Sequence, residues 1–119
     1  MINAAIVGMG RWGQTLVNSV SDTENHLCFV AGTTHTLSKV EQYAAEKDIR
    51  LYSSFSEILS DNSVDAVVLA SPHTTHFKQI IAAADAGKHV FCEKPFCLKS
   101  EDARIALETL EANNLKVAI

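Results

Sequence analysis

The stretch Asn3–Gly13, NAAIVGMGRWG, decides the fold that this chain is expected to adopt. It opens with the apolar run Ala4–Val7, which is too short for a helix and has the length of a buried strand. Three glycines follow in the spacing G-x-G-x-x-G, and Gln14–Val20 then has the apolar pattern of a helix. A strand, a glycine turn and a helix in this order bind the pyrophosphate of a dinucleotide at the helix N-terminus.

Each glycine of this motif has its own expected role. Gly8 makes the tight turn, Gly10 lets backbone N–H groups approach the phosphates, and Gly13 lets the helix pack closely on the strand. Glycines also cluster in ordinary turns, so the spacing alone is weak evidence. Its place between a strand and a helix favours nucleotide binding over a purely structural turn.

Composition narrows the class of protein. The 119 residues are 47% hydrophobic and 20% charged, which suits one domain with a real core. A net charge of -4 without any lysine or arginine run argues against nucleic-acid binding. No apolar stretch approaches the roughly 20 residues of a membrane helix, and no basic segment marks a signal peptide. Cys28, Cys92 and Cys97 have no metal-like spacing, so we expect reduced thiols in a cytoplasmic protein.

Strand-like and helix-like segments alternate along the whole chain. The strands expected after the first are Leu27–Ala31, Ile49–Tyr52, Val64–Ala70, Lys88–Cys92 and Leu115–Ile119. The helices expected after the first run from about Ser38 to Lys47, from Ser54 through Leu59, from Thr74 to Ala86, and from Ser100 to about Asn113. This alternation predicts an α/β fold, a Rossmann-type doubly wound parallel sheet with helices on both faces.

Three serines are expected to cap helices. Ser38 and Ser54 each precede a glutamate by three residues, which is the capping-box spacing. Ser100 precedes an acidic first turn and is expected to be the N-cap of the last helix. Gly87 is expected to end the helix before it.

Four motifs fall where expected strands end. They are Gly8–Gly13, Thr33–His35, Ser71–His76 and Glu93–Pro95. Ligands of parallel sheets bind beyond the C-terminal ends of the strands. The convergence of the four motifs at that edge therefore predicts one site.

The second of these motifs bears on the choice of cofactor. Thr34 follows Gly13 by 21 positions, about where an acidic residue reads the adenosine ribose in NAD-binding proteins. No acidic residue is present to repel a 2′-phosphate, while hydroxyl groups and Lys39 suit one. NADP is thus slightly favoured over NAD. The alternative is a loop that contacts the ribose weakly and shows little preference.

The segment AGKHVFCEKP that ends at Pro95, with AIVGMGRWG at the start and VDAVVLASPHTTH between them, resembles the glucose–fructose oxidoreductase/inositol dehydrogenase (Gfo/Idh/MocA) family. The resemblance covers residues 1–119 as one domain, the family's N-terminal NAD(P)-binding domain, and the family's second, substrate-holding domain is expected to be absent. It implies a small-molecule substrate and hydride transfer at a CH–OH or carbonyl carbon of a sugar, polyol or similar compound.

The resemblance also implies roles for individual residues. The pyrophosphate would be lined by Gly8, Gly10, Arg11 and Trp12, the adenosine ribose by Thr33, Thr34 and His35, the nicotinamide half by Ser71, Pro72, His73 and His76, and the nicotinamide and substrate by Glu93 and Lys94. Many members carry Asp at the position of Thr34, which leaves the cofactor open. The family's other catalytic groups, an Asp and a His of the second domain, have no counterpart here.

Lys94 is the candidate catalytic residue. An ammonium group there would hydrogen-bond the reacting hydroxyl and stabilise charge on its oxygen during hydride transfer. The alternative is an ordinary solvated lysine. Glu93 would orient the ribose or set the protonation of Lys94, and Pro95 would fix the local backbone.

The two histidines of the third motif have weaker assignments. His76 either contacts the ligand or caps its helix locally. Metal binding by His73 and His76 lacks a third ligand at suitable spacing, so no metal is expected.

Two functions remain open at this point. One is the cofactor domain of an NAD(P)-dependent oxidoreductase, and the other is a non-catalytic dinucleotide-binding or sensor module. The intact Glu93-Lys94-Pro95 sequence favours the first. The absent substrate domain favours the second for the chain as it stands.

We predict that the 119-residue chain binds a nicotinamide dinucleotide without turnover and self-associates as a homo-oligomer. Hydride transfer needs a substrate held close to the nicotinamide, and the walls that hold a sugar are expected in the second domain. The surface which that domain covers is expected to be exposed here, and exposed apolar patches favour association. Light scattering and a dehydrogenase assay on polyols and sugars test both statements. A monodisperse monomer would refute the association, and measurable turnover would refute the incomplete site.

Overall fold

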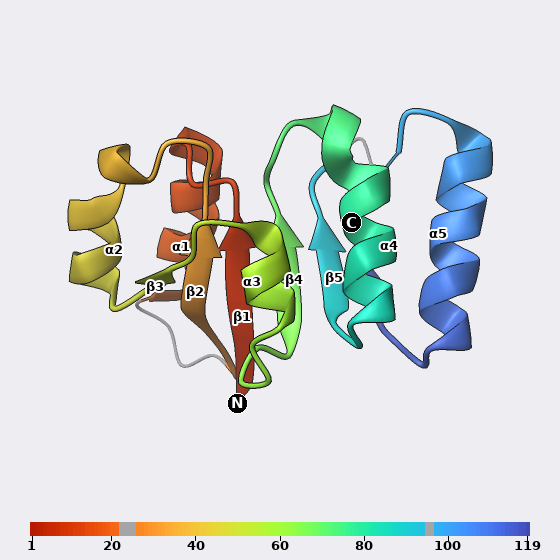
Figure 1. The fold of residues 1–119 in the computed structure, drawn as a ribbon, viewed down its shortest axis with the longest axis horizontal. Helices are drawn as coiled ribbons and strands as arrows, with labels where there is room; N and C mark the ends of the chain where they lie inside the picture. The colour runs from red at the N-terminus through yellow and green to blue at the C-terminus, as the bar shows by residue number, and fades with distance from the viewer. Residues whose placement is uncertain (22–25, 95–96) are drawn as a thin grey trace.

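The computed structural model describes residues 1–21, 26–94 and 97–119 (Figure 1). Within these ranges the strands form one parallel sheet in the order β3-β2-β1-β4-β5-β6. The strands are β1 (Ile2–Val7), β2 (Leu27–Thr33), β3 (Arg50–Leu51), β4 (Ala66–Leu69), β5 (His89–Cys92) and β6 (Val117–Ala118). The strand order reverses between β1 and β4, as in doubly wound dinucleotide-binding folds. The predicted fold class is confirmed.

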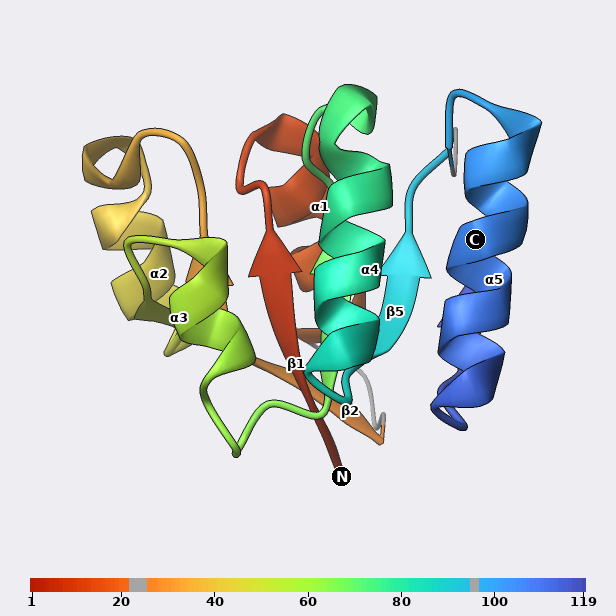
Figure 2. The same cartoon turned by 45° about the vertical axis from the view of Figure 1, so that its right-hand side comes forward.

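Helices cover both faces of the sheet. They are α1 (Arg11–Ser21), α2 (Glu41–Lys47), α3 (Phe55–Leu59), α4 (His76–Asp85) and α5 (Ser100–Ala112), with the short 3-10 turns η1 (Leu37–Lys39) and η2 (His73–Thr75). One core joins α3, α4 and α5 to the sheet, and the other joins α1 and α2 to its opposite face. Figure 2 shows α4 in front of the strands and α1 behind them. The sheet is therefore buried on both sides at its centre.

Strand β1 carries the centre of both cores. Ala4 and Ile6 pack on the α1 side, and Ala5 and Val7 pack on the α4 side. Because successive side chains of a strand point to opposite faces, a fully apolar run is what a central parallel strand requires. The expectation of a buried strand at this place is confirmed.

Most element boundaries differ from expectation by a few residues. Helix α1 begins at Arg11 rather than Gln14, so the last glycine of the motif lies in its first turn. Strand β2 continues beyond Ala31 to Thr33 through Gly32, where a Cβ would lie 2.8 Å from the sulfur of Met9. Strand β1 begins at Ile2 rather than Ala4, whereas the other expected strands are shorter in the structure. The helix expected from Thr74 begins as η2 and becomes α4 at His76.

One of the three expected serine caps is confirmed. Ser54 precedes α3, and its hydroxyl oxygen accepts a hydrogen bond from the backbone N–H of Glu57 at 3.3 Å. Ser38 instead lies in η1, and α2 begins after Val40 without a side-chain cap. Ser100 is the first residue of α5, not its N-cap. Gly87 follows α4 with φ +77°, as a helix stop requires.

A polar cluster that the sequence did not predict lies at the N-terminal end of β5. Lys88 is only 6% exposed, and its ammonium donates to the carbonyl oxygens of Asp61 and Val64 at 2.9 and 2.7 Å. The Asp61 carboxylate accepts hydrogen bonds from Ser63 and from the Tyr52 hydroxyl, which hold the pKa of this carboxyl well below its usual range. The cluster fastens the connection between α3 and β4 to β5.

An apolar groove of about 220 Å³ lies on the α1 face of the sheet. Val20, Phe29 and Phe91 are among the side chains that line it, from α1, β2 and β5.

Within the described ranges no helix has the length and apolar character needed to cross a membrane.

The cap assignments predict different effects of two matched substitutions. Ser54→Ala removes the bond to the Glu57 N–H and should lower the free energy of unfolding by about 1 kcal/mol. Ser100→Ala removes no capping bond, so stability should stay within about 0.5 kcal/mol of the wild type, as for ordinary surface changes. Urea unfolding followed by circular dichroism measures both. A loss at Ser100 equal to that at Ser54 would contradict the observed start of α5.

Candidate functional site

The C-terminal ends of the central strands are joined by backbone hydrogen bonds. The N–H of Gly8 donates to the carbonyl of Thr33 at 2.9 Å, and the N–H of Ala70 donates to that of Val7 at 2.8 Å. The N–H of Glu93 donates to the last residue of β4 at 3.1 Å. The segments that follow β1, β2, β4 and β5 thus meet at one edge, as the parallel topology predicts.

Two of the three glycines of the motif have no room for a side chain. Gly8 has φ +95°, and a Cβ on it would lie 2.7 Å from the backbone carbonyl carbon of Ala70. A Cβ on Gly13 would lie 1.9 Å from the carbonyl oxygen of Gly8. Both distances are shorter than the Cβ contacts that proteins show, so the tight turn and the close helix packing have the expected geometry.

Gly10 and the start of α1 form an open, positively polarised surface. A Cβ on Gly10 would meet no atom within 4 Å, and the residue is exposed. The first N–H groups of a helix lack intrahelical partners and carry partial positive charge. The first turn of α1 holds no acidic residue, and Arg11 there is exposed. These residues fit the pyrophosphate of a dinucleotide. Trp12 is exposed beside them.

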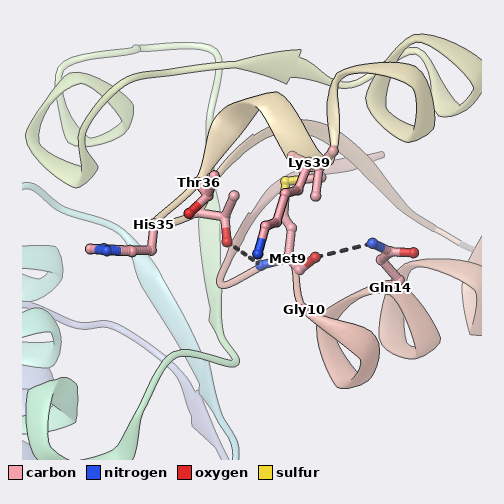
Figure 3. A pocket seen from close by; sticks show the side chains of 8 residues that line it. Met9, Gly10, Gln14, His35, Thr36 and Lys39 are labelled. Carbon is pink, nitrogen blue, oxygen red and sulfur yellow. Dashed lines mark hydrogen bonds between the residues drawn. The ribbon is translucent and has the colours of Figure 1, made fainter.

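A cavity of about 310 Å³ lies next to this turn (Figure 3). Its lining comprises Met9, Gly10, Gln14, Thr34, His35, Thr36, Lys39 and Val40. Two bonds fix Met9 at its wall: the Met9 N–H donates to the Thr34 hydroxyl at 3.1 Å, and the Gln14 amide donates to the Met9 carbonyl at 3.1 Å.

The charged side chain that lines this cavity is positive. Lys39 is the cation of its lining, and the lining contains no carboxylate. In Figure 3 the Lys39 side chain extends from η1 into the cavity, whereas His35 points away from its centre. Thr33 is buried, so its side chain faces the core side of the turn rather than solvent. The lining of this cavity therefore favours an anionic group over a cationic one.

The turn after β4 is held by side chains of η2 and α4. The Ser71 hydroxyl donates to the Gln79 side chain at 2.6 Å, and the Thr75 hydroxyl donates to the Pro72 carbonyl at 2.7 Å. His76 is 1% exposed, with Nε2 2.9 Å from the Ser71 carbonyl oxygen. The structure therefore surrounds His76 with protein. His73 lies in η2.

The segment after β5 carries the candidate catalytic lysine. Glu93 is half-buried and Lys94 is exposed, and both follow β5 at the edge where the glycine turn lies. Pro95, expected to fix the backbone here, lies outside the described residues. The roles of Glu93 and Lys94 stay predictions.

Sequence reasoning missed the contribution of Cys92. Its sulfur lies 3.2 Å from Nδ1 of His76, and burial raises the pKa of this thiol to about 12. The position directly before Glu93 was its only signal. Cys28 and Cys97 are free thiols as well. Among the described residues, no group of three or more His, Cys, Asp or Glu side chains is placed to hold a metal ion.

Comparison with known proteins gives the family. Residues 2–119 match the family described as "Oxidoreductase family, NAD-binding Rossmann fold" (GFO_IDH_MocA). The chain belongs to this family. These residues correspond to the family's NAD-binding Rossmann domain, and the resemblance carried by the motifs is confirmed.

Relatives in this family include sugar and polyol dehydrogenases. The scyllo-inositol 2-dehydrogenase (NAD(+)) of Bacillus subtilis (strain 168) is 34% identical over 115 residues, covering 92% of this chain and 32% of the relative. The D-xylose 1-dehydrogenase (NADP(+)) of Hypocrea jecorina is 41% identical over 68 residues, covering 57% of this chain and 17% of the relative.

Solved Gfo/Idh/MocA structures share the fold. The scyllo-inositol dehydrogenase of Lactobacillus casei, solved with bound NAD(H) and scyllo-inositol, is 29% identical with a TM-score of 0.89. The match covers 98% of this chain and 35% of that one. These two inositol dehydrogenases match nearly all residues of this chain, and the chain spans about a third of their length.

Proposed function

We propose that this domain binds NADP or NAD for an oxidoreductase that acts by hydride transfer on a CH–OH or carbonyl carbon of a sugar, polyol or similar small molecule. One observation carries the proposal: the open Gly10 turn and the acid-free start of α1 lie at the same sheet edge as the segment with Lys94. The names of the related inositol and xylose dehydrogenases support the substrate class.

In this proposal, segments at the ends of four strands each bind a different part of the dinucleotide. Backbone N–H groups of Gly10, Arg11 and Trp12 would hold the pyrophosphate. The cavity at Thr34 would hold the adenosine ribose, and the turn after β4 would lie along the nicotinamide half. When bound, the cofactor supplies the nicotinamide that accepts or donates the hydride.

Binding of the dinucleotide is tested by Gly10→Val. The valine side chain would enter the open space that the pyrophosphate needs, and no protein atom lies within 4 Å to clash with its Cβ. We expect a folded protein whose affinity for NAD and NADP is lost in calorimetry. Ala45→Val, on the exposed side of α2, serves as the control and should bind normally. Unchanged affinity in a folded Gly10→Val protein would contradict the assignment.

We further propose that the cavity accepts the 2′-phosphate of NADP, so that NADP binds at least as well as NAD. Lys39 and the hydroxyls of Thr34 and Thr36 line it, and no carboxylate there repels a phosphate. The names of the relatives include both NAD(+) and NADP(+) enzymes, so the preference rests on these side chains.

The cofactor preference is tested by Thr34→Asp and Lys39→Met. The aspartate should move the preference towards NAD by repelling the 2′-phosphate and accepting from the ribose. Lys39→Met should weaken NADP and leave NAD unchanged, while Lys47→Met in the last turn of α2 should change neither. Calorimetric titrations with both cofactors measure these changes. If the wild type binds NAD about tenfold more tightly, a difference of about 1.4 kcal/mol, the proposed preference is wrong.

We propose that Lys94 holds a proton at the reacting oxygen of the substrate. In a polypeptide that carries this domain together with a substrate domain, Lys94→Ala should lower kcat by about 10²–10⁴-fold and leave the dinucleotide Kd nearly unchanged. Lys99→Ala, at an exposed position before α5, serves as the control. Steady-state kinetics measure both variants. Near-normal turnover of the Lys94 variant would show that Lys94 is an ordinary solvated lysine.

A further inference from the structure

We infer that His76 is a positioning residue that joins the turn after β4 to the end of β5, and so places the nicotinamide half of the site relative to Lys94. The inference rests on the proposed dinucleotide binding. His76 begins α4, and its ring lies between the Ser71 carbonyl oxygen, 2.9 Å from Nε2, and the Cys92 sulfur, 3.2 Å from Nδ1. Ser71 follows β4, and Cys92 is the last residue of β5.

The chemistry of the two contacts defines the form of the ring. A carbonyl oxygen only accepts hydrogen bonds, so Nε2 of His76 carries the proton and donates to Ser71. In the neutral ring Nδ1 is then an acceptor, and the thiol of Cys92 is its donor. Burial raises the pKa of Cys92 to about 12, which keeps this thiol protonated. The same thiol also donates to the carbonyl oxygen of Glu93, 3.4 Å from the sulfur, so its one proton is shared between these two acceptors.

The bridge adds a side-chain link to two strand ends that the sheet already joins, where Leu69 pairs with Cys92 and its carbonyl accepts from the Glu93 N–H. Side chains of Thr75 and Gln79 fasten the turn after β4 from its own side, through Pro72 and Ser71. The His76 ring reaches across to β5, and Glu93 and Lys94 follow the residue that it contacts. A small displacement of reacting groups costs a large factor in rate, so a bridge at this place governs the geometry of the site.

Direct contact between His76 and a ligand fits the structure less well. The side chain is 1% exposed, and both ring nitrogens have protein partners. A ligand would have to displace the Ser71 carbonyl or the Cys92 thiol to reach the ring. The influence of His76 on the cofactor is therefore transmitted through the backbone of the two strand ends.

The test compares NAD⁺ with ADP-ribose, which lacks the nicotinamide. His76→Leu should weaken NAD⁺ binding by about tenfold, the scale of a lost buried hydrogen bond, and leave the Kd for ADP-ribose within about twofold of the wild type. His76→Gln keeps an N–H donor near the place of Nε2 and should recover part of the loss. His89→Leu is the control, because His89 lies at the other end of β5, where its Nδ1 accepts from the N–H of Lys116. It should change neither affinity.

Equal weakening of both ligands by His76→Leu, or of neither, would overturn the inference, since a general loss of structure does not distinguish the two halves of the cofactor. If that variant does not fold, ¹⁵N NMR of the wild type decides. NAD⁺ should shift the His76 ring and the Glu93 and Lys94 amides, and ADP-ribose should not. Identical responses to both ligands would overturn the bridge.

Failure of the dinucleotide proposal would look different. In that case the wild type would bind neither NAD⁺ nor ADP-ribose. The His76 ring would still show a proton on Nε2 and none on Nδ1 in ¹⁵N spectra, because the bridge belongs to the ligand-free protein. A proton on Nδ1 with Nε2 bare would contradict the bridge independently of any ligand.

Discussion

The contact between Gly13 and the carbonyl oxygen of Gly8 is the constraint on which the site depends. A Cβ at Gly13 would lie 1.9 Å from that oxygen, so α1 can begin directly over the end of β1 only because Gly13 lacks a side chain. This approach places the unpaired N–H groups at the start of α1 beyond the sheet edge, where Gly10 leaves open space. The hydrogen bond from Gly8 to Thr33 then brings the end of β2, with the cavity at Thr34, to the same turn.

The two edges of the sheet have opposite character. At the N-terminal end of β5, the buried Lys88 ammonium donates hydrogen bonds to the carbonyl oxygens of Asp61 and Val64. At the C-terminal edge, Gly10 and Lys94 are exposed, and the first turn of α1 has no acidic residue to neutralise it. A helix start without acidic residues suits the anionic pyrophosphate of a dinucleotide. The proposed dinucleotide site and the Lys88 cluster thus lie at opposite edges of the sheet.

Much of the fold and the location of the site could be predicted, because both depend on local patterns and on topology. Alternating strands and helices imply a parallel sheet, and the parallel sheet brings the ends of its strands together whatever the details. Side-chain partners across the sheet could not be predicted. The capping-box spacing occurs at both Ser38 and Ser54, yet only Ser54 caps a helix, because η1 places Ser38 in a different turn. The contact of His76 with Cys92 joins residues 16 positions apart, and no local pattern specifies it.

The account is tested most directly by an ¹⁵N–¹H NMR titration of the 119-residue chain with NADP⁺. It predicts that the largest amide shifts occur at Gly10, Arg11 and Trp12, as their N–H groups gain phosphate partners at the start of α1. Smaller shifts at Thr34 would mark the ribose. Saturable binding that leaves the amides of the glycine turn unmoved, or the absence of binding, would contradict the claim that the close approach of Gly8 and Gly13 builds a pyrophosphate site.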